Sequence, residues 1–201
     1  INDSVVCGYG YTNPYLSFLN KQNKNLQISA MQPEFLDGNV KEKYDFDHQI
    51  IHEYFLPLDP SSVDVVISTH LLEFVDKPQS SIEEIWRILK PNGLFLTIIP
   101  RRSGIWTRYD NNPFGFGRSY SIKQFKSLIQ DFLVLDYRKS FLHFPPWDHY
   151  LNYKSHRTIE KIGDFFFPYM GGLMICVCKK IVYAKSTKKQ KKIPIKSFVA
   201  T

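Results

Sequence analysis

Cysteine is scarce in this sequence. Its three copies, Cys7, Cys176 and Cys178, are an odd number without metal-ligand spacing, which suits a reducing compartment better than a disulfide framework. Cys176 and Cys178 are two positions apart, so on a strand their thiols would share one face. We expect them to serve packing rather than redox chemistry, and we expect a cytoplasmic protein.

Signatures of several other protein classes are missing. The chain has no run of about 18 apolar residues and no signal-peptide pattern, so neither a membrane span nor export is expected. Its six histidines lack spacings such as His-Glu-x-x-His, and no metal is expected. A Walker loop and a Gly-x-Ser-x-Gly motif are also absent. The sequence therefore gives no support for a zinc protease, a P-loop nucleotidase or a serine hydrolase.

Acidic residues are lacking at the end of the chain. Eight lysines and no Asp or Glu follow residue 178, whereas the whole chain has a net charge of +7, so the remainder is nearly neutral. We expect a domain over residues 1–183 and a basic lysine-rich tail over residues 184–201. The tail is either solvated or in contact with nucleic acid or an anionic surface. Since Ile1 stands close to the first expected strand, a native N-terminal segment that covers part of the site is a further hypothesis.

The chain has enough apolar residues for one globular domain, since 43% of its 201 residues are apolar. Its clearest pattern lies in residues 56–100 and predicts a strand, a helix and a second strand. Residues 63–67 are apolar and β-branched apart from Asp64, which is typical of a buried strand in a parallel sheet. Residues 94–99 form the second run of this kind.

The helix between these two strands has clear boundary signals. Ser80 and Ser81 each precede a glutamate by three residues, which predicts the N-cap there. The segment Pro91-Asn92-Gly93 predicts the helix end. Four apolar residues at helical spacing predict the face that packs on the sheet, namely Ile82, Ile85, Trp86 and Leu89. In such a crossover, ligands bind beyond the carboxyl ends of the strands, here residues 68–70 and 100–102.

A strand, a turn and a helix are predicted at the start of the chain. Residues 4–7 predict the strand, Gly8-Tyr9-Gly10 the turn, and Thr12 or Asn13 the cap of a helix with Pro14 in its first turn. That helix is expected to bury Tyr15, Phe18 and Leu19. Glycines let a ligand approach the backbone, and a helix N-terminus offers free amides. An ordinary tight turn is the alternative interpretation.

The remaining elements complete the predicted fold. Strands are expected at residues 26–30, 133–141 and 173–183, and helices at residues 121–132 and 156–167. Ser121 and Gln124 have the spacing of a capping box. Together the elements predict an α/β fold: a Rossmann-like, doubly wound, mostly parallel sheet of about seven strands flanked by helices.

Three segments in the first half of the chain occur in a characteristic order: LPLDPSSVDVV, THLLEFVDKP and EEIWRILKPNGLF. In this order and spacing they resemble the class I S-adenosylmethionine-dependent methyltransferases, in particular the type 11 small-molecule group. The resemblance extends over residues 5–180. The loop RRSGIWTRYDNNPFGFGRSYS is similar to that of a bacterial subgroup. The resemblance implies S-adenosylmethionine as cofactor and methyl transfer to a small-molecule acceptor by in-line displacement, without a metal.

The resemblance also implies a cofactor site built from four segments. These would contribute Cys7, Gly8, Tyr9, Gly10, Ala30, Met31, Glu53, Tyr54, Thr69, His70 and Leu71. Some positions depart from the family pattern. Val6 and His52 stand where the family has acids, and Thr12 stands where it has a glycine.

The second strand also lacks the acid that binds the ribose in the family. Ser29, Ala30 and Met31 stand at its expected end, and the nearest carboxylate is Glu34. A missing charged acceptor weakens cofactor binding, because each such hydrogen bond contributes about 1.5–3 kcal/mol. The alternative function is therefore a catalytically silent domain of the same fold that binds or assembles with a partner.

Three residues are candidates for catalysis. His70 is best placed as a general base, or it forms a wall beside the sulfonium. Tyr109 and Arg118 belong to residues 101–118, a loop rich in arginine and aromatic residues and long enough for a lid. Such a loop suits an acceptor with a flat or greasy body and an acidic group, unless its aromatic residues simply pack onto the domain. Glu73 is expected on a helix surface.

Overall fold

The computed structural model describes residues 3–36, 44–104, 117–143, 160–163, 165–166, 171–180 and 182. Its seven strands form one sheet in the order β3-β2-β1-β4-β5-β7-β6. In chain order they are β1 (Val5–Gly10), β2 (Gln27–Pro33), β3 (Asp47–Ile51), β4 (Val63–Thr69), β5 (Leu89–Pro100), β6 (Leu133–Phe141) and β7 (Leu173–Lys180). β7 is antiparallel to both of its neighbours, and all other pairs are parallel. The predicted mostly parallel sheet is confirmed.

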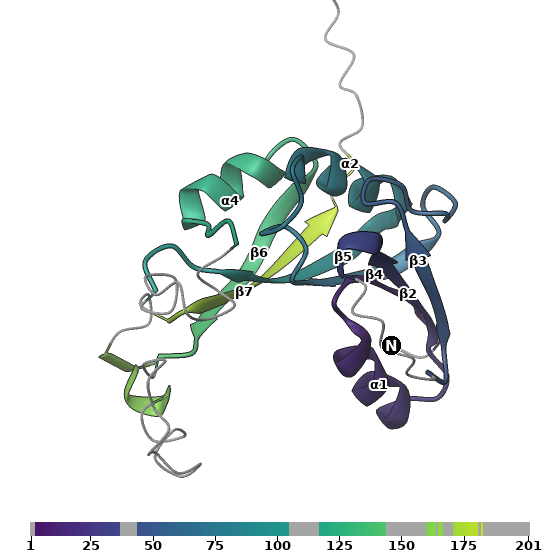
Figure 1. The fold of residues 1–201 in the computed structure, drawn as a ribbon, viewed down its shortest axis with the longest axis horizontal. Coiled ribbons are helices and arrows are strands. Elements are labelled where there is room, and N and C mark those ends of the chain that lie inside the picture. The colour runs from purple at the N-terminus through teal and green to yellow at the C-terminus, as the bar shows by residue number, and fades with distance from the viewer. Residues whose placement is uncertain are drawn as a thin grey trace, which may run out of the picture.

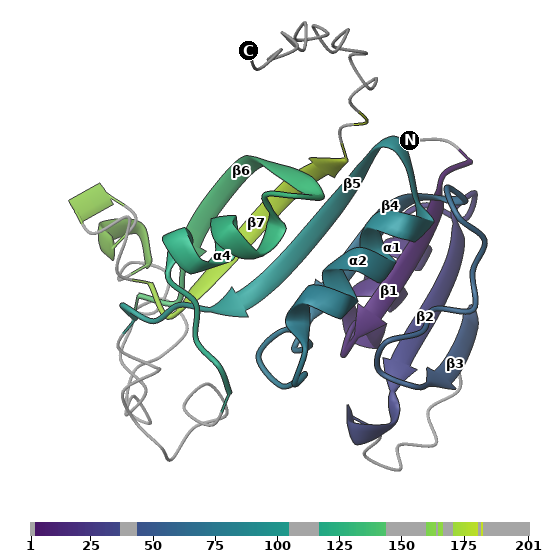
Figure 2. The same cartoon turned by 90° about the horizontal axis from the view of Figure 1, so that it is seen from above.

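Helices cover both faces of this sheet. Figure 1 shows α1 (Asn13–Gln22) on one face and α2 (Pro78–Ile88) and α4 (Ile122–Ile129) on the other. Figure 2 shows α2 and α4 side by side along the strands. The arrangement is the doubly wound architecture that the sequence predicted, because helices pack on both sides of the parallel strands.

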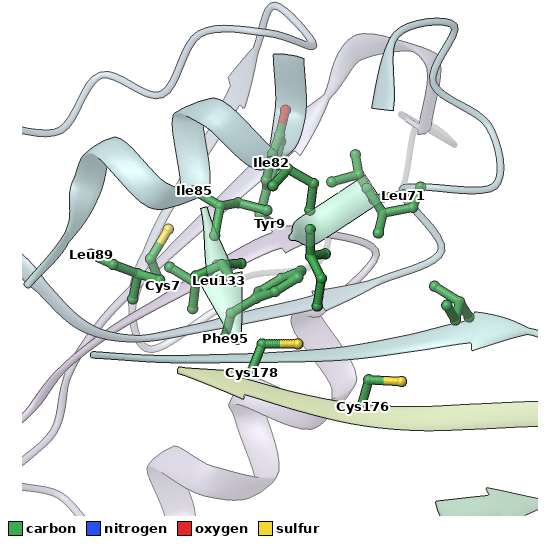
Figure 3. Packing of buried hydrophobic residues seen from close by; sticks show 14 of the residues in the cluster. Cys7, Tyr9, Leu71, Ile82, Ile85, Leu89, Phe95, Leu133, Cys176 and Cys178 are labelled. Atoms are coloured by element: carbon green, nitrogen blue, oxygen red, sulfur yellow. The ribbon is translucent and has the colours of Figure 1, made fainter. Parts of the chain in front are cut away.

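Two apolar cores lie between the helices and the sheet. The larger one holds Cys7 and Tyr9 of β1 together with apolar side chains of α2, α4 and β7, and Figure 3 shows Ile82 and Ile85 packed above Phe95. The smaller one lies on the α1 face and includes Val6. Successive β1 residues therefore enter opposite cores, as the alternation of a strand requires. The predicted packing role of Cys176 and Cys178 is confirmed, because both are fully buried, and Cys7 is fully buried as well.

α2 begins before its predicted start. Its N-cap is Lys77, and Pro78 occupies the first turn without a side-chain capping bond, so the predicted cap at Ser80 and Ser81 was wrong. A proline serves at this position because its missing amide hydrogen has no partner in a helix anyway. The earlier start makes Ser81 a buried residue inside the helix.

The inward face of α2 also differs by one residue. Ile82, Ile85 and Leu89 are buried as predicted, but Trp86 is 37% exposed and Ile88 is buried in its place. The Trp86 ring packs edge-on against Phe132, with 6.2 Å between ring centroids. The helix ends at Ile88, before the predicted Pro91 breaker.

α1 has the predicted cap but a different buried face. Thr12 is the N-cap and Pro14 lies in the first turn, as expected. Leu16 is fully buried, whereas Tyr15 and Phe18 are 45% and 62% exposed, so the predicted inward positions of these two aromatic residues were wrong. The reason lies in β1: Leu16 packs directly on Gly8, where a Cβ would overlap with its side chain.

The second half of the sheet follows the sequence pattern closely. The capping box of Ser121 and Gln124 forms at the start of α4, and β6 has the predicted bounds. β7 ends at Lys180, short of the expected residue 183. Residues 160–163 and 165–166 are helical, in agreement with the predicted helix 156–167.

Some predictions fall on parts of the chain that the structure leaves undescribed. They concern most of the loop 101–118, including Tyr109, and the lysine-rich tail 184–201. The domain boundary at residue 183 therefore stays a prediction. Within the described ranges, no helix has the length and apolar character needed to cross a membrane.

Candidate functional site

The carboxyl ends of β1 and β4 lie side by side. The parallel register pairs Tyr9 with Ser68 and Gly10 with Thr69. Beyond the strand ends, the Tyr11 amide donates to the Thr69 carbonyl at 2.9 Å, and the Thr69 hydroxyl donates to the Tyr11 carbonyl. The two strand ends are thus fixed to each other at the edge where parallel α/β sheets bind ligands.

The structure requires glycine at positions 8 and 10 for two different reasons. The predicted turn at these residues was wrong, because β1 continues through Gly10. Gly8 lies inside the strand and leaves room for Thr12 and Leu16 of the following helix turn. Gly10 has a φ of +102°, and a Cβ on it would lie 2.6 Å from the Thr69 carbonyl oxygen. Only glycine meets both demands at this position.

The start of α1 offers fewer amide donors than predicted. The amides of Tyr11, Thr12, Tyr15 and Leu16 all donate to backbone carbonyls of the protein, and Pro14 has no amide hydrogen. Polar side chains near these amides are therefore further candidates for contacts with a ligand. Asn13 is 3% exposed, and its Oδ1 atom is buried without a hydrogen-bond partner among the described residues.

The second strand ends later than predicted, and this changes the residue at its tip. β2 continues to Pro33, so Ala30 and Met31 lie inside it, opposite Gly8 and Tyr9. Both of their side chains are 1% exposed and belong to the cores. The polar residue near the carboxyl end of β2 is Gln32 instead.

Gln32 is a polar residue at the candidate site that the sequence pattern did not indicate. Its Oε1 atom lies 3.3 Å from Asn13 Nδ2 and 3.3 Å from His48 Nε2, and its Nε2 atom donates to the Leu36 carbonyl at 2.9 Å. Gln32 therefore links the end of β2 to the start of α1. The signal in the sequence was Pro33, which follows Gln32 and is tolerated at the end of a strand but rarely within one.

The segment after β3 lies beside β1. The Tyr9 hydroxyl donates to the Glu53 carbonyl, and the Tyr54 hydroxyl accepts a bond from the Lys77 amide at 3.0 Å. Burial raises the pKa of Tyr9, so the phenol stays protonated as this donor requires. The predicted neighbours Glu53 and Tyr54 are thus near β1, and both are half-buried.

His70 and Glu73 form a polar pair at the end of β4. His70 Nδ1 lies 3.0 Å from Glu73 Oε1, and their side chains are 29% and 1% exposed. His70 has a φ of +52°, and its ring centroid is 6.3 Å from that of Tyr11. The prediction that Glu73 lies on a helix surface was wrong, because residues 71–77 form turns before α2 begins and direct its carboxylate inward.

The predicted acceptor loop returns to the domain at this pair. The Arg118 amide donates to the Glu73 carbonyl at 2.8 Å, and a Cβ on Gly117 would lie 2.9 Å from Glu73 Cβ. Arg118 itself is exposed. The structure therefore brings His70 and Arg118 to the same edge, whereas Tyr109 lies outside the described residues.

Two predicted cofactor residues bury their side chains. Cys7 packs in the larger core, where burial raises the pKa of its thiol to about 12. Leu71 is fully buried in the same core. Any contact of Cys7 or Leu71 with a ligand would therefore involve backbone atoms.

Comparisons with known proteins support the resemblance. The family model described as "Methyltransferase domain" matches residues 4–97, and no curated protein matches the sequence significantly. This family match confirms the resemblance to class I S-adenosylmethionine-dependent methyltransferases and supports S-adenosylmethionine as cofactor. The bacterial subgroup and the cytoplasmic location stay predictions.

Similar solved structures establish the fold alone. A possible histamine N-methyltransferase from Thermotoga maritima has a TM-score of 0.63 and 18% identity, with coverage of 90% of this chain and 84% of the other. The complex of the Haloferax volcanii Trm112 methyltransferase activator with a putative methyltransferase has a TM-score of 0.63 and 18% identity, and the match covers 91% of this chain and 84% of the other. A putative methyltransferase from Listeria monocytogenes has a TM-score of 0.61 and 9% identity, and the match covers 90% of this chain and 91% of the other.

Proposed function

We propose that this chain, whose residues 4–97 match the family model described as "Methyltransferase domain", is an enzyme that transfers a methyl group from S-adenosylmethionine to a small-molecule acceptor. One observation carries the proposal. The ends of β1 and β4 are fixed side by side at Gly10 and Thr69, and the glycine keeps the β1 tip free of a side chain. A nucleoside-containing ligand can approach the backbone most closely at such a position.

Side chains at this edge fit the cofactor. Asn13 Oδ1 is buried and lacks a partner among the described residues, so it would accept a hydrogen bond from a ribose hydroxyl. Gln32 would replace the acid of the family with a neutral amide. The predicted residues Glu53, Tyr54, Thr69 and His70 would line the remainder of the site. When bound, S-adenosylmethionine supplies an electrophilic methyl group.

His70 is the proposed general base at this site. Its ring stands at the end of β4, partly exposed, where an acceptor next to the cofactor would lie. Proton removal by a positioned imidazole typically contributes about 10²–10⁴-fold to a rate. Arg118 and Tyr109 are proposed to bind the acceptor, with the guanidinium on an acidic group of that molecule.

A second candidate is a catalytically silent domain that binds a partner protein. It is favoured by the neutral Gln32 at the end of β2, whose amide nitrogen is already bound to the Leu36 carbonyl. The similar structure from Haloferax volcanii is a complex with an activator protein, so a protein partner is compatible with this fold. In this candidate the cofactor site would have lost its function.

Calorimetry with S-adenosylmethionine and S-adenosylhomocysteine separates the two candidates. We expect the wild-type chain to bind both compounds. Asn13→Ala should weaken binding by about tenfold, because one hydrogen bond contributes about 1 kcal/mol or slightly more. Asn20→Ala, on the same helix but away from the site, is the matched control and should bind as the wild type does. The absence of binding to either compound at millimolar concentration would refute the enzymatic proposal.

A further inference from the structure

We propose that Glu73 is a positioning residue that holds the His70 ring with Nδ1–H toward its carboxylate and Nε2 toward the acceptor. This inference rests on the proposed function, since it assigns a partner to the proposed base. Its geometry is the 3.0 Å contact between His70 Nδ1 and Glu73 Oε1. In a neutral imidazole, a hydrogen bond at one nitrogen decides which nitrogen carries the proton.

The burial of Glu73 supports this positioning role. Its side chain is 1% exposed, and glutamate is almost never fully buried unless it is paired. One carboxylate oxygen contacts His70, whereas Oε2 is buried without a partner among the described residues. A carboxylate with a purely structural role is normally satisfied at both oxygens. Glu73 therefore occupies a position that costs stability, as expected of a functional group.

The surroundings of Glu73 would accommodate an apolar side chain instead. Leu71 and Leu72 are fully buried beside it in the sequence, and Gly117 packs against its Cβ atom. An apolar residue of similar size in this space would avoid the cost of burying a charge. The chain instead has an acid that faces His70.

Among the described residues, the charged and titratable groups identified around the pair come from two segments. Tyr11, after β1, faces the His70 ring. Tyr120 donates its hydroxyl to the Leu72 carbonyl at 2.7 Å, and it also interacts electrostatically with Glu73 and with Arg118. The backbone amide of Arg118 donates to the Glu73 carbonyl. Among the described residues, the carboxylate that contacts His70 Nδ1 is that of Glu73.

The pair gives His70 the properties that proton removal requires. The acceptor's proton would move to Nε2, so the ring would become an imidazolium and the acceptor would keep the electron pair of the bond that held the proton. The carboxylate would stabilise the imidazolium through the existing Nδ1–H bond, as a buried acid does for a catalytic histidine in other enzymes. The left-handed backbone of His70 turns the chain so that a residue three positions later reaches the ring.

The tautomer of His70 tests the proposal without an acceptor. Nitrogen-15 NMR of histidine-labelled protein at a pH where the ring is neutral reports which nitrogen carries the proton. We expect His70 protonated at Nδ1 in the wild type. In Glu73→Leu the signal should move toward the tautomer mixture of free imidazole, whereas in Glu73→Gln, whose amide oxygen still accepts, the Nδ1–H form should persist. Glu83→Gln, an exposed charge removal on α2, is the matched control and should leave the signal unchanged.

Each outcome of the NMR experiment either supports or overturns the proposal. Protonation at Nε2 in the wild type, or an unchanged tautomer in Glu73→Leu, would overturn it. If Glu73→Leu does not fold, the wild-type spectrum still decides. Calorimetry with S-adenosylhomocysteine on the wild type is run in parallel, because its failure would remove the proposed function whereas the tautomer result addresses the pair alone.

Discussion

Gly10 is the residue on which the geometry of the candidate site depends most. Its left-handed φ lets β1 end directly against Thr69, and no side chain intervenes between the strand tips. The importance of Gly8 and Gly10 could be identified from the sequence, but the structural reason for glycine at each position could not. Those reasons lie in the packing of Leu16 and in the register between β1 and β4, which are tertiary features.

Gly10→Ala should lower stability and abolish binding of S-adenosylhomocysteine. A non-glycine residue in a sparsely populated backbone region costs about 1–3 kcal/mol, and the new Cβ would lie 2.6 Å from the Thr69 carbonyl oxygen. Urea unfolding measures the stability and calorimetry the binding.

Gly93→Ala is the control for this substitution. A Cβ there would lie 2.9 Å from the Lys90 carbonyl oxygen and 3.1 Å from that of Asp64, at the opposite end of β4 from the site. It should also lower stability but leave binding intact. Equal loss of binding in both variants would mean that Gly10 acts only through stability.

Glu73 illustrates what residue patterns alone do not reveal. Its spacing after His70 fitted an exposed helical position. The structure buries it because the chain turns at residues 71–77 and because residues 117 and 118 return over it. The burial of a carboxylate depends on such distant segments, so no local pattern predicts it.

At the scale of elements, Asp64 connects the starts of β1 and β4. It is the single polar interruption of the apolar run 63–67, and its carboxylate accepts bonds from Lys90 Nζ at 2.8 Å and from the Val5 amide at 2.9 Å. These donors, Lys90 first, hold the pKa of Asp64 below its usual value. The carboxylate therefore stabilises the fold above its unfolded pKa near 4, and this contribution is lost as the pH falls through the folded pKa.

Asp64→Asn should make the free energy of unfolding less dependent on pH in the acid range. At pH 7 the variant should be less stable by about 0.5–1 kcal/mol, because the Lys90 and Asp64 side chains are 40% and 34% exposed and such exposed ion pairs are weak. Well below pH 4 the difference should vanish, since the wild-type carboxyl is then protonated. Urea unfolding across this range measures it. Asp131→Asn, an exposed position, is the control, and an equal difference at both pH values would contradict the assignment.

The boundaries of elements were predicted unevenly for a physical reason. The start of α4 matched because a capping box is a local signal, and β6 has the predicted bounds, whereas α4 ends at Ile129 and not at the predicted residue 132. α2 and β2 did not match, because Pro78 started the helix earlier and sheet pairing extended β2 to Pro33. Local propensity fixes the type of an element better than its ends. The late end of β2 matters most, since it puts Gln32 near the expected ribose position.

At the scale of the whole molecule, the strand order places the site. β1 lies between β2 and β4, so the Gly10, Gln32 and His70 regions converge at one edge although they are far apart in the sequence. The α/β class and the approximate number of strands followed from the sequence. The antiparallel β7 between β5 and β6 did not, because a strand pattern contains no information on direction or neighbour.

The most direct test of the account is an NMR titration of the isotope-labelled chain with S-adenosylhomocysteine, followed through its backbone amides. The account predicts shifts at the carboxyl edge of β1, β2 and β4 and in the adjoining segment with Glu53 and Tyr54, whereas α4 and β6 stay unchanged. Gly10, Asn13, Gln32, His70 and Leu71 should be among the affected amides. No shift at millimolar ligand, or shifts gathered away from this edge, would contradict the claim that these three strand ends frame the cofactor site.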